Sequence, residues 1–249
     1  MEQGKRQVLI KSSRWLVITQ VTQRVQSIQE KPERALIIMT RVPVARETKT
    51  RLMTRFTGEE CVAFHEACLE DLNRLQQKIN IPVYISYTGS LTDKFISLFS
   101  ENVRYIPQGE GDLGVRMAQA FFRVLSSYKH VVMIGSDIPN LTESHLEGAF
   151  AGLESGKDLV FGPALDGGYY LIGMNNFHSE VFEGIIWSRA DVLEKTIKRV
   201  QESGLSYSLL EKMRDLDTYE DLLEYTRNPE NASTRAWQML QEHLTIAKA

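Results

Sequence analysis

The sequence predicts an α/β protein with a mostly parallel central sheet and helices on both faces. Short apolar runs rich in branched residues, such as 35–39 and 130–134, are typical of strands buried on both faces. Between such runs lie longer stretches, such as 58–79, with apolar residues mostly at three- and four-residue steps, as in amphipathic helices. Strands and helices that alternate at this spacing favour parallel strands joined by crossover helices.

The expected elements follow one another along the chain. We expect strands at 35–39, 83–87, 103–106, 130–134, 159–161 and 169–172, and helices at 58–79, 112–126, 142–155 and 191–203. Asp112 lies where a helix N-terminus favours negative charge, and Thr142 can serve as an N-cap. Helical periodicity near 219–225 and 236–244 predicts a helical C-terminal part. We expect one domain at 34–249 and an N-terminal extension at 1–33, in which 8–10 and 15–23 form an edge hairpin or an appendage.

Composition narrows the class of protein. The 249 residues carry a formal net charge of −3, which gives no basis for binding a nucleic acid through its phosphates. Two cysteines are typical of a reducing compartment rather than of a disulfide-bridged secreted domain. No apolar run reaches the roughly 18 residues that cross a bilayer, and no signal peptide is recognisable. We therefore expect a cytoplasmic protein without a membrane span.

The loop after the first expected strand carries clustered cations. Arg41, Arg46, Lys49 and Arg51 stand against one acid, Glu47. Arginine offers a bidentate fork and lysine a point charge, so the cluster suits a polyphosphate; a solvated basic loop is the alternative. The Walker A and dinucleotide-binding motifs are both absent, which counts against those nucleotide sites.

A glycine-rich segment follows the third expected strand. Three glycines within 109–114 let the backbone approach a ligand closely, and the helix that begins there directs free N–H groups at it. An ordinary glycine-rich turn is the alternative.

Asp137 follows the apolar run 130–134. In open α/β sheets ligands bind beyond the carboxyl ends of the strands, where a buried acid is costly unless something uses its charge. Mg²⁺ would use it, because this ion takes one or two carboxylates plus substrate phosphates; a cap of the next turn is the alternative. We expect Asp137 at the end of a central strand, with its carboxylate in the largest cleft and near Lys49, Arg51 or other donors.

Asp166 precedes Gly167 and Gly168 in the run GPALDGGYYLIG. Asp-Gly-Gly is also a turn signal, so a hairpin is the simpler interpretation. If Asp166 faces the same crevice as Asp137, it adds a second metal ligand or an acid/base group.

The motifs together resemble a known family. TRVP, KTRL, QGEGDLGVRM, GSDIPNLT, GPALDGGYYLIG, Trp187-Ser188 and DLDTYEDL occur in this order over about 35–222. The chain thereby resembles the bacterial glycosyltransferase-like family DUF2064 of the nucleotide-diphospho-sugar transferase superfamily. It is similar, more distantly, to the guanylyltransferases of molybdenum-cofactor and phospholactate metabolism. The ordered motifs are specific for the family and much less so for a reaction.

The resemblance implies a GT-A-like three-layer sandwich that binds a nucleotide over its first strands. It places Asp137 at the metal-binding acid, and Asp215 and Asp217 in a closing motif that is more often structural than catalytic. It implies a phosphate loop that contains Arg41, Pro43, Lys49 and Arg51. It implies contacts to the base and sugar of the nucleotide from Gln108, Gly109, Gly114 and Arg116. The implied acceptor side contains Asp166, Gly167, Gly168 and Tyr169, and the resemblance allows Trp187 a role there as well.

The phosphate loop departs from the family pattern K-x-P-x-x-G-x-x-K-T-R-L. Arg41 stands at the lysine position and Arg46 at the glycine position. If that glycine supplies positive φ or close approach, Arg46 puts the loop geometry and nucleotide affinity in question.

Cys61, His65 and Cys68 share one face of the helix expected at 58–79. Three such ligands could begin a zinc site, but no fourth is evident, and buried cysteine is common in cores. We expect core packing.

Three functions follow. The first is a transferase with a nucleotide-sugar donor and Mg²⁺ or Mn²⁺ on Asp137, in which Lys49 and Arg51 hold the phosphates, Asp166 is the candidate base, and a small acceptor of unknown identity lies near Tyr169. The second is transfer of a nucleotidyl group from an NTP to a small phosphorylated acid. The third is a non-catalytic nucleotide-binding protein, which only Arg46 favours.

Overall fold

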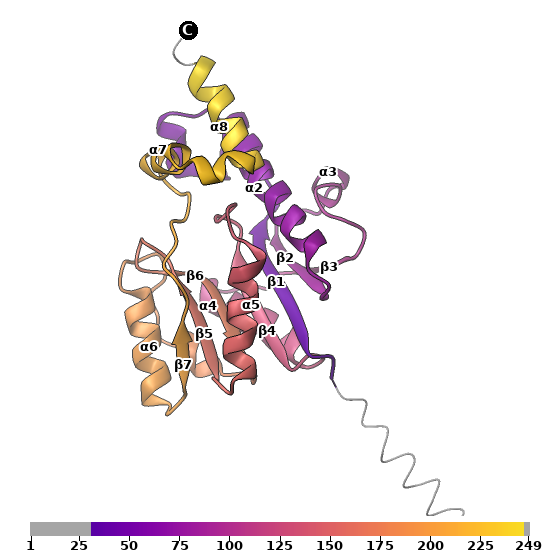
Figure 1. Ribbon diagram of the computed structural model, residues 1–249, viewed down its shortest axis with the longest axis vertical. Helices are drawn as coiled ribbons and strands as arrows, with labels where there is room; N and C mark the ends of the chain where they lie inside the picture. Colours follow the sequence, from indigo (N-terminus) through magenta and orange to yellow (C-terminus); the bar gives the residue numbers. More distant parts are fainter. Residues whose placement is uncertain (1–30, 247–249) are drawn as a thin grey trace, which may run out of the picture. The chain divides into compact units, whose positions relative to one another are not determined.

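A seven-stranded sheet forms the centre of the computed structural model, which describes residues 31–246 (Figure 1). The strand order is β3-β2-β1-β4-β6-β5-β7. All neighbouring strands are parallel except β6, which runs antiparallel to both β4 and β5. This confirms the mostly parallel sheet. The strands are β1 (Arg34–Arg41), β2 (Val83–Thr88), β3 (Val103–Pro107), β4 (His130–Gly135), β5 (Leu159–Pro163), β6 (Tyr169–Met174) and β7 (Tyr207–Leu209).

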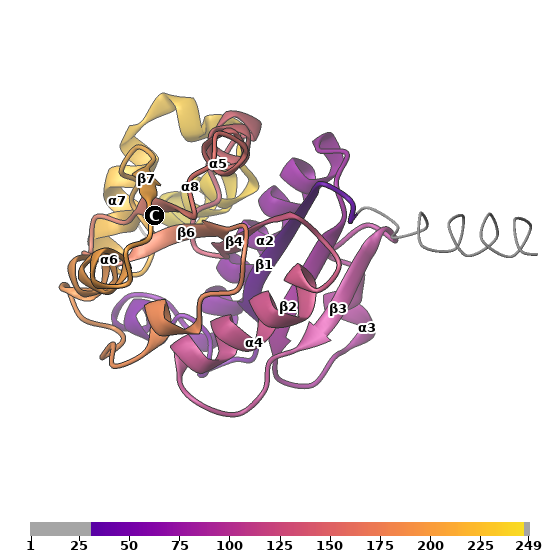
Figure 2. The ribbon, with the colours of Figure 1, turned by 90° about the horizontal axis from the view of Figure 1, so that it is seen from below.

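Helices cover both faces of the sheet, as predicted (Figure 2). One core layer lies between the sheet and α2 and α5, and the other between the sheet, α4 and α6. The α-helices are α2 (Gly58–Lys78), α3 (Asp93–Ile96), α4 (Leu113–Leu125), α5 (Glu143–Glu154), α6 (Val192–Glu202), α7 (Tyr219–Arg227) and α8 (Arg235–Ile246), and the 3-10 helices are η1 (Thr50–Thr54), η2 (Ser179–Phe182) and η3 (Pro229–Ser233).

Polar caps fix where the helices begin. Thr57 forms a capping box with Glu60 at the start of α2. Asp112 caps α4 by accepting a hydrogen bond from the Val115 N–H at 2.9 Å, so the expected helix begins where its acid predicts. Thr142 is the N-cap of α5, also as expected.

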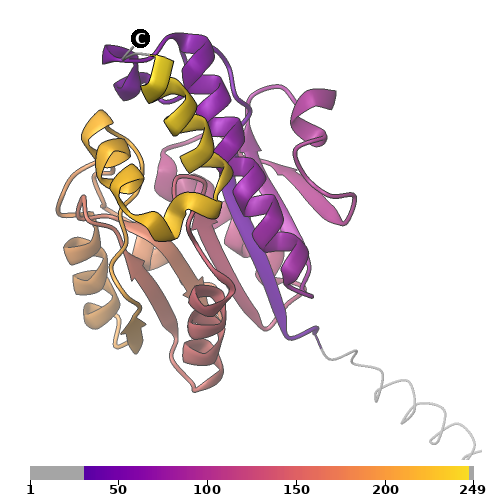
Figure 3. The same cartoon turned by 45° about the horizontal axis from the view of Figure 1, so that its top comes forward.

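A third core holds the C-terminal helices against the start of α2. Leu52, Phe64 and Leu240 are among its fully or almost fully buried members, and α8 lies along α2 (Figure 3). The buried carboxylate of Asp71 on α2 accepts hydrogen bonds from the backbone N–H groups of Arg235 and Ala236 at 2.7 and 2.9 Å. This carboxylate caps the first turn of α8 and fixes its end on α2.

Cys61, His65 and Cys68 are buried on α2, which confirms core packing for this face. Among residues 31–246 no cluster of three or more histidine, cysteine or acidic side chains could hold a metal ion. Within the same range no helix combines the length and apolar character that a membrane crossing requires.

The expected N-terminal extension falls almost entirely outside the described residues, including the segments 8–10 and 15–23. The boundary at residue 33 stays a prediction.

The loop after β1 contains two non-glycine residues in the left-handed region. Arg46 has φ 68° and Lys49 has φ 51°. Thr48 holds the loop together, because its hydroxyl accepts from the Val44 N–H at 2.9 Å and its own N–H donates to the Val44 carbonyl at 3.0 Å. Arg46 thus adopts the conformation that the family's glycine favours, at the steric cost of a Cβ atom.

We predict that Arg46→Gly stabilises the protein by about 0.5–1 kcal/mol, because the relief of left-handed strain exceeds the added freedom of the unfolded chain. Urea unfolding measures the change. Arg46→Ala is the matched control, since it removes the exposed side chain but keeps Cβ. Equal stability of the two variants would contradict a strained Arg46.

Candidate functional site

Asp137 lies two residues beyond β4, the middle strand of the sheet, as the sequence predicts. Its Oδ1 is 2.7 Å from Lys49 Nζ. Burial alone would raise the pKa of Asp137, but the Lys49 ammonium lowers it below its usual range, with smaller effects of His65 and Arg41. The carboxylate is therefore ionised at neutral pH and held by the first loop.

Lys49 joins that loop to the closing motif. Its Nζ lies 3.2 Å from Asp217 Oδ1 and donates to the Leu216 carbonyl at 2.6 Å, while its side chain is only 5% exposed. Burial would lower the pKa of Lys49, but Asp137 and Asp217 together raise it above its usual value. Arg51 Nη1 lies 3.3 Å from Asp217 Oδ2 at the surface. The closing motif, which we expected to be structural, thus places the Asp217 carboxylate at the site.

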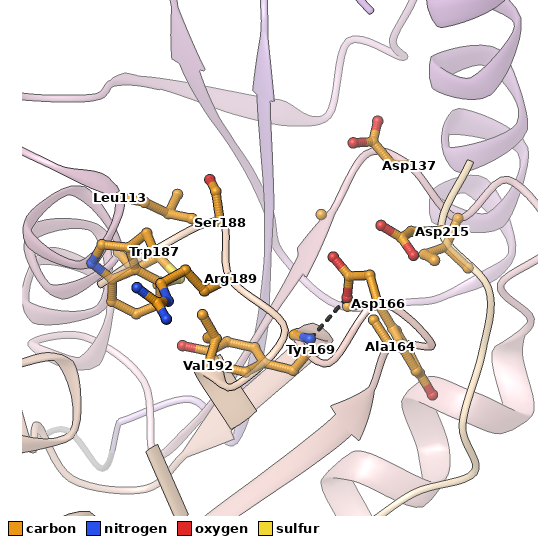
Figure 4. A pocket seen from close by; sticks show the side chains of 15 residues that line it. Leu113, Asp137, Ala164, Asp166, Tyr169, Trp187, Ser188, Arg189, Val192 and Asp215 are labelled. Carbon is orange, nitrogen blue, oxygen red and sulfur yellow. Dashed lines mark hydrogen bonds between the residues drawn. The ribbon is translucent and has the colours of Figure 1, made fainter. Parts of the chain in front are cut away.

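Two cavities meet at Asp137. The first, of about 210 Å³, is called here the cationic cavity; it is lined by Thr40, Arg41, Thr48, Lys49, Thr88, Gln108, Leu113, Arg116, Asp137 and others. The second, of about 200 Å³, is called the carboxylate cavity; its lining includes Leu113, Asp137, Asp166, Tyr169, Trp187, Arg189 and Asp215 (Figure 4). The predicted nucleotide residues that line a cavity line the cationic one, the predicted acceptor residues that line a cavity line the carboxylate one, and Asp137 lines both.

The donors of the cationic cavity are partly engaged by the backbone. Gln108 Nε2 donates to the carbonyls of Thr40 and Ser86 at 3.1 and 2.9 Å, which leaves its oxygen for a ligand. Arg41 Nη1 donates to the Glu47 carbonyl and Arg116 Nε to the Gly111 carbonyl, each at 2.9 Å. Each arginine keeps further N–H groups for an anion.

Some predicted site residues lie outside both linings. Pro43, Arg51, Gly109, Gly114 and Gly167 are not among the lining residues.

Two of these glycines have a packing role. A Cβ atom on Gly114 would lie 2.5 Å from the Trp187 ring, and one on Gly167, which has φ 92°, would lie 1.9 Å from the Ala190 carbonyl oxygen. Both positions therefore need glycine for close approach of the segment around Trp187. A ligand contact at either stays a prediction.

The carboxylate cavity gathers acids from three loops. Asp166 Oδ1 accepts the Gly168 N–H at 2.8 Å within the Asp-Gly-Gly turn. Burial, followed by repulsion from Asp166 and Asp217, raises the pKa of Asp215 to about 6. Asp215 was not singled out from the sequence as a chemical group, although its spacing of two residues from Asp217 was the available signal.

His65 was expected only as a core residue, yet it also lines the cationic cavity. Its Nε2 lies 3.2 Å from Thr40 Oγ1 and 3.4 Å from the Arg41 carbonyl. Burial lowers the pKa of His65 to about 4, so the imidazole is neutral at physiological pH. It supports the end of β1 as an uncharged hydrogen-bonding group.

The prediction that Asp137 lies in the largest cleft is wrong. A cavity of about 640 Å³ lies between α2, the start of α5 and residues 228–234, and its lining includes Asp71, Arg74, Asn140 and His145. Polar residues of η3 and on either side of it, from Asn228 to Thr234, contribute to this lining.

Comparisons with known proteins agree with the motifs. The model of the family described as "Uncharacterized protein conserved in bacteria (DUF2064)" matches residues 71–189, which confirms the resemblance over that range. A comparison with curated proteins gives no match.

Solved structures share the fold. A protein of Desulfovibrio desulfuricans, described as a "putative nucleotide-diphospho-sugar transferase", is 26% identical with TM-score 0.80, over 87% of this chain and 97% of that chain. The CMP:2-keto-3-deoxy-manno-octonic acid synthetase complexed with CTP is 10% identical with TM-score 0.53, over 84% and 99%. The 4-diphosphocytidyl-2C-methyl-D-erythritol synthase of Anaerococcus prevotii is 9% identical with TM-score 0.51, over 79% and 99%. The last two show the fold alone. Together the comparisons confirm the nucleotide-diphospho-sugar transferase fold and support a transferase.

We predict that Asp215→Asn stabilises the metal-free protein near pH 7.5 by roughly 1–2 kcal/mol. The substitution removes a partly solvated carboxylate that Asp166 and Asp217 repel. The folded state binds the Asp215 proton more tightly than the unfolded chain, so ionisation destabilises the fold as the pH rises through about 6. The gain should vanish near pH 4, where Asp215 is protonated in the folded state. Urea unfolding with EDTA at both pH values tests this. The exposed Glu101→Gln is the control, and an equal gain at both pH values would contradict the mechanism.

Proposed function

We propose that this protein is a metal-dependent transferase that takes a nucleotide-activated sugar as its donor. The observation that carries the proposal is the position of Asp137, which lines both the cationic and the carboxylate cavity. Donor phosphates need cations, and an acceptor hydroxyl needs a base, so two adjoining cavities of opposite lining suit a group transfer between them. The likeness to the Desulfovibrio desulfuricans protein supports the same class.

The donor phosphates would lie in the cationic cavity. Arg41, Lys49 and Arg116 line it, together with the hydroxyl groups of Thr40 and Thr88. Guanidinium groups bind phosphate oxygens through paired N–H donors, and a buried ammonium adds a point charge. These side chains would hold the diphosphate in place and stabilise it as it leaves.

The residues around Asp137 fit a divalent cation. Asp137 contacts Lys49 Nζ through Oδ1 and its side chain is 38% exposed, so Oδ2 is the hard oxygen donor that an ion beside Lys49 would use. Mg²⁺ and Mn²⁺ prefer such donors. Asp137 would hold the ion, which when bound would neutralise the diphosphate charge, while Asp217 stays paired with Lys49 and Arg51.

The acceptor would enter the carboxylate cavity. Its hydroxyl oxygen would form a bond to the anomeric carbon of the donor, while the bond from that carbon to the diphosphate oxygen breaks. The hydroxyl proton would pass to a carboxylate, for which Asp166 and Asp215 are the candidates. Asp215 has its pKa raised to about 6, close to the value that suits a general base near neutral pH.

Nucleotidyl transfer from an NTP to a small phosphorylated acid is the second candidate. The cationic cavity favours it as much as the first, because three cations suit a triphosphate as well as a diphosphate sugar. Arg46, the feature that favoured a non-catalytic role, has φ 68°, the left-handed conformation that a glycine would favour there, so the loop geometry gives that role less support.

We predict that Asp137→Asn weakens metal-dependent nucleotide binding at least about a hundredfold, roughly 2.8 kcal/mol, but lowers stability by only about 1–2 kcal/mol. Lys49 keeps Asp217 and the Leu216 carbonyl as partners, which limits the structural cost. Calorimetry with UDP- and GDP-sugars and free NTPs, with and without Mn²⁺, measures the affinity. Asp93→Asn on α3, outside both cavities, is the matched control. Retained binding with a lowered melting temperature would make Asp137 a structural cap, and no binding of any nucleotide by the wild type would end the proposal.

The released product should separate the two candidates. Glycosyl transfer releases a nucleoside diphosphate, whereas nucleotidyl transfer releases pyrophosphate. We expect a nucleoside diphosphate, and we expect Asp166→Asn and Asp215→Asn to slow its release by 10- to 10⁴-fold according to which of them is the base. Pyrophosphate release from an NTP would favour the second candidate instead.

A further inference from the structure

The carboxylate cavity has a cationic end that the proposed function leaves unused. Among the described residues that line it, Arg189 is the only cation. Figure 4 shows Arg189 beside Trp187 and Ser188, across the cavity from the carboxylates of Asp137, Asp166 and Asp215. The cavity is therefore polarised along its length, with acids at one end and a guanidinium at the other.

The segment that carries Arg189 is held in a fixed position. Ser188 has φ 62°, a left-handed conformation that costs a non-glycine residue about 1–2 kcal/mol and persists where the surroundings impose it. Trp187 packs into the space above Gly114, and the Leu193 N–H donates to the Gly167 carbonyl at 2.9 Å. These contacts dock the segment onto the turn that presents Asp166.

The Arg189 guanidinium keeps most of its hydrogen-bonding capacity. Its Nε lies 3.5 Å from Asp191 Oδ1, and the other oxygen of Asp191 lies 2.8 Å from Lys195 Nζ. Over residues 31–246, Arg189 has no other carboxylate within 4.0 Å. Two terminal nitrogens thus remain for the parallel pair of bonds that a carboxylate or a phosphate accepts.

We propose that Arg189 binds an anionic group of the acceptor, a carboxylate or a phosphate, that is separate from the oxygen that reacts. This inference rests on the proposed function, which places the reacting oxygen near Asp166. Three carboxylates would repel an anion at the other end, so the anionic group lies at Arg189 and the acceptor enters in one direction.

The remaining lining of the cavity indicates the rest of the acceptor. Met117, Ile138, Tyr169, Trp187 and Val192 line it with mainly apolar atoms. A cavity of about 200 Å³ admits only a small molecule. The acceptor class is therefore a short molecule with a reactive oxygen at one end, an apolar middle and an anionic group at the other.

The test uses the full-length protein without metal or nucleotide. The chain has three tryptophans, so its ¹⁵N spectrum has three indole N–H signals, and Trp187→Phe identifies the one from the cavity. Methyl phosphate and propionate are titrated to about 50 mM, with uncharged propionamide as the matched neutral probe. We expect both anions to shift the Trp187 signal with low-millimolar midpoints.

The variants locate the binding group. Arg189→Gln should raise the anion midpoint at least tenfold, and Arg189→Lys should raise it only a few-fold, since it keeps the charge but loses the fork. Arg123→Gln, an exposed arginine on α4 that lines neither cavity, should change nothing. An unshifted Trp187 signal in the wild type, an unchanged midpoint in Arg189→Gln, or equal binding of propionamide would each overturn the proposal.

This experiment is independent of the donor. Metal-dependent nucleotide binding without an Arg189-dependent anion shift would refute the anion site and leave the proposed function standing. An anion shift without any nucleotide binding would refute the proposed function.

Discussion

The buried ammonium of Lys49 is the interaction on which the site depends. It contacts Asp137 and Asp217 and the Leu216 carbonyl, and so connects the loop after β1, the end of β4 and the closing motif. Two carboxylates this close repel each other strongly unless a cation lies between them, and a buried cation is costly without such partners. Each charge therefore offsets the cost of burying the others. Together they hold three segments that are distant in the sequence within hydrogen-bonding distance of one another.

The third core packs next to the cluster of Lys49, Asp137 and Asp217 and holds its backbone in place. Leu216, which precedes Asp217 in the sequence, is fully buried in this core. Its N–H donates to the Asp137 carbonyl at 3.0 Å. Leu52 and Phe56, just after Lys49, belong to the same core. Asp71 fixes α8 on α2 and so closes this core. The C-terminal helices thus position catalytic candidates that they do not themselves contain.

Local pattern predicted the main strands and helices and the position of Asp137, because apolar runs and caps are local signals. β7 was missed because two half-buried residues and an exposed one give no such run, and α3 because it is a single turn. Half of the predicted nucleotide residues and most of the predicted acceptor residues line the two cavities, and their roles stay predictions. The pairing of Lys49 with Asp217 and the raised pKa of Asp215 could not be read from the chain, since both arise from residues far apart in sequence. The size of the cavity between α2 and the start of α5 could not be predicted either, because its lining comes from segments far apart in the sequence.

Backbone strain in the described part of the chain is concentrated at this site. Its three non-glycine residues with positive φ are Arg46 and Lys49 in the first loop and Ser188 beside the carboxylate cavity. Such conformations persist only where surrounding contacts outweigh them. For Lys49 those contacts are the two carboxylates, and for Ser188 they are the packing of its neighbours against Gly114 and Gly167. Arg46 packs against Gly58, where a Cβ atom would lie 3.0 Å from Arg46 N, and its strain is further offset by the loop that Thr48 and Lys49 hold in place. Arg46 is therefore tolerated at the position where the family pattern has glycine, because the contacts of Thr48 and Lys49, rather than residue 46, fix the shape of the loop.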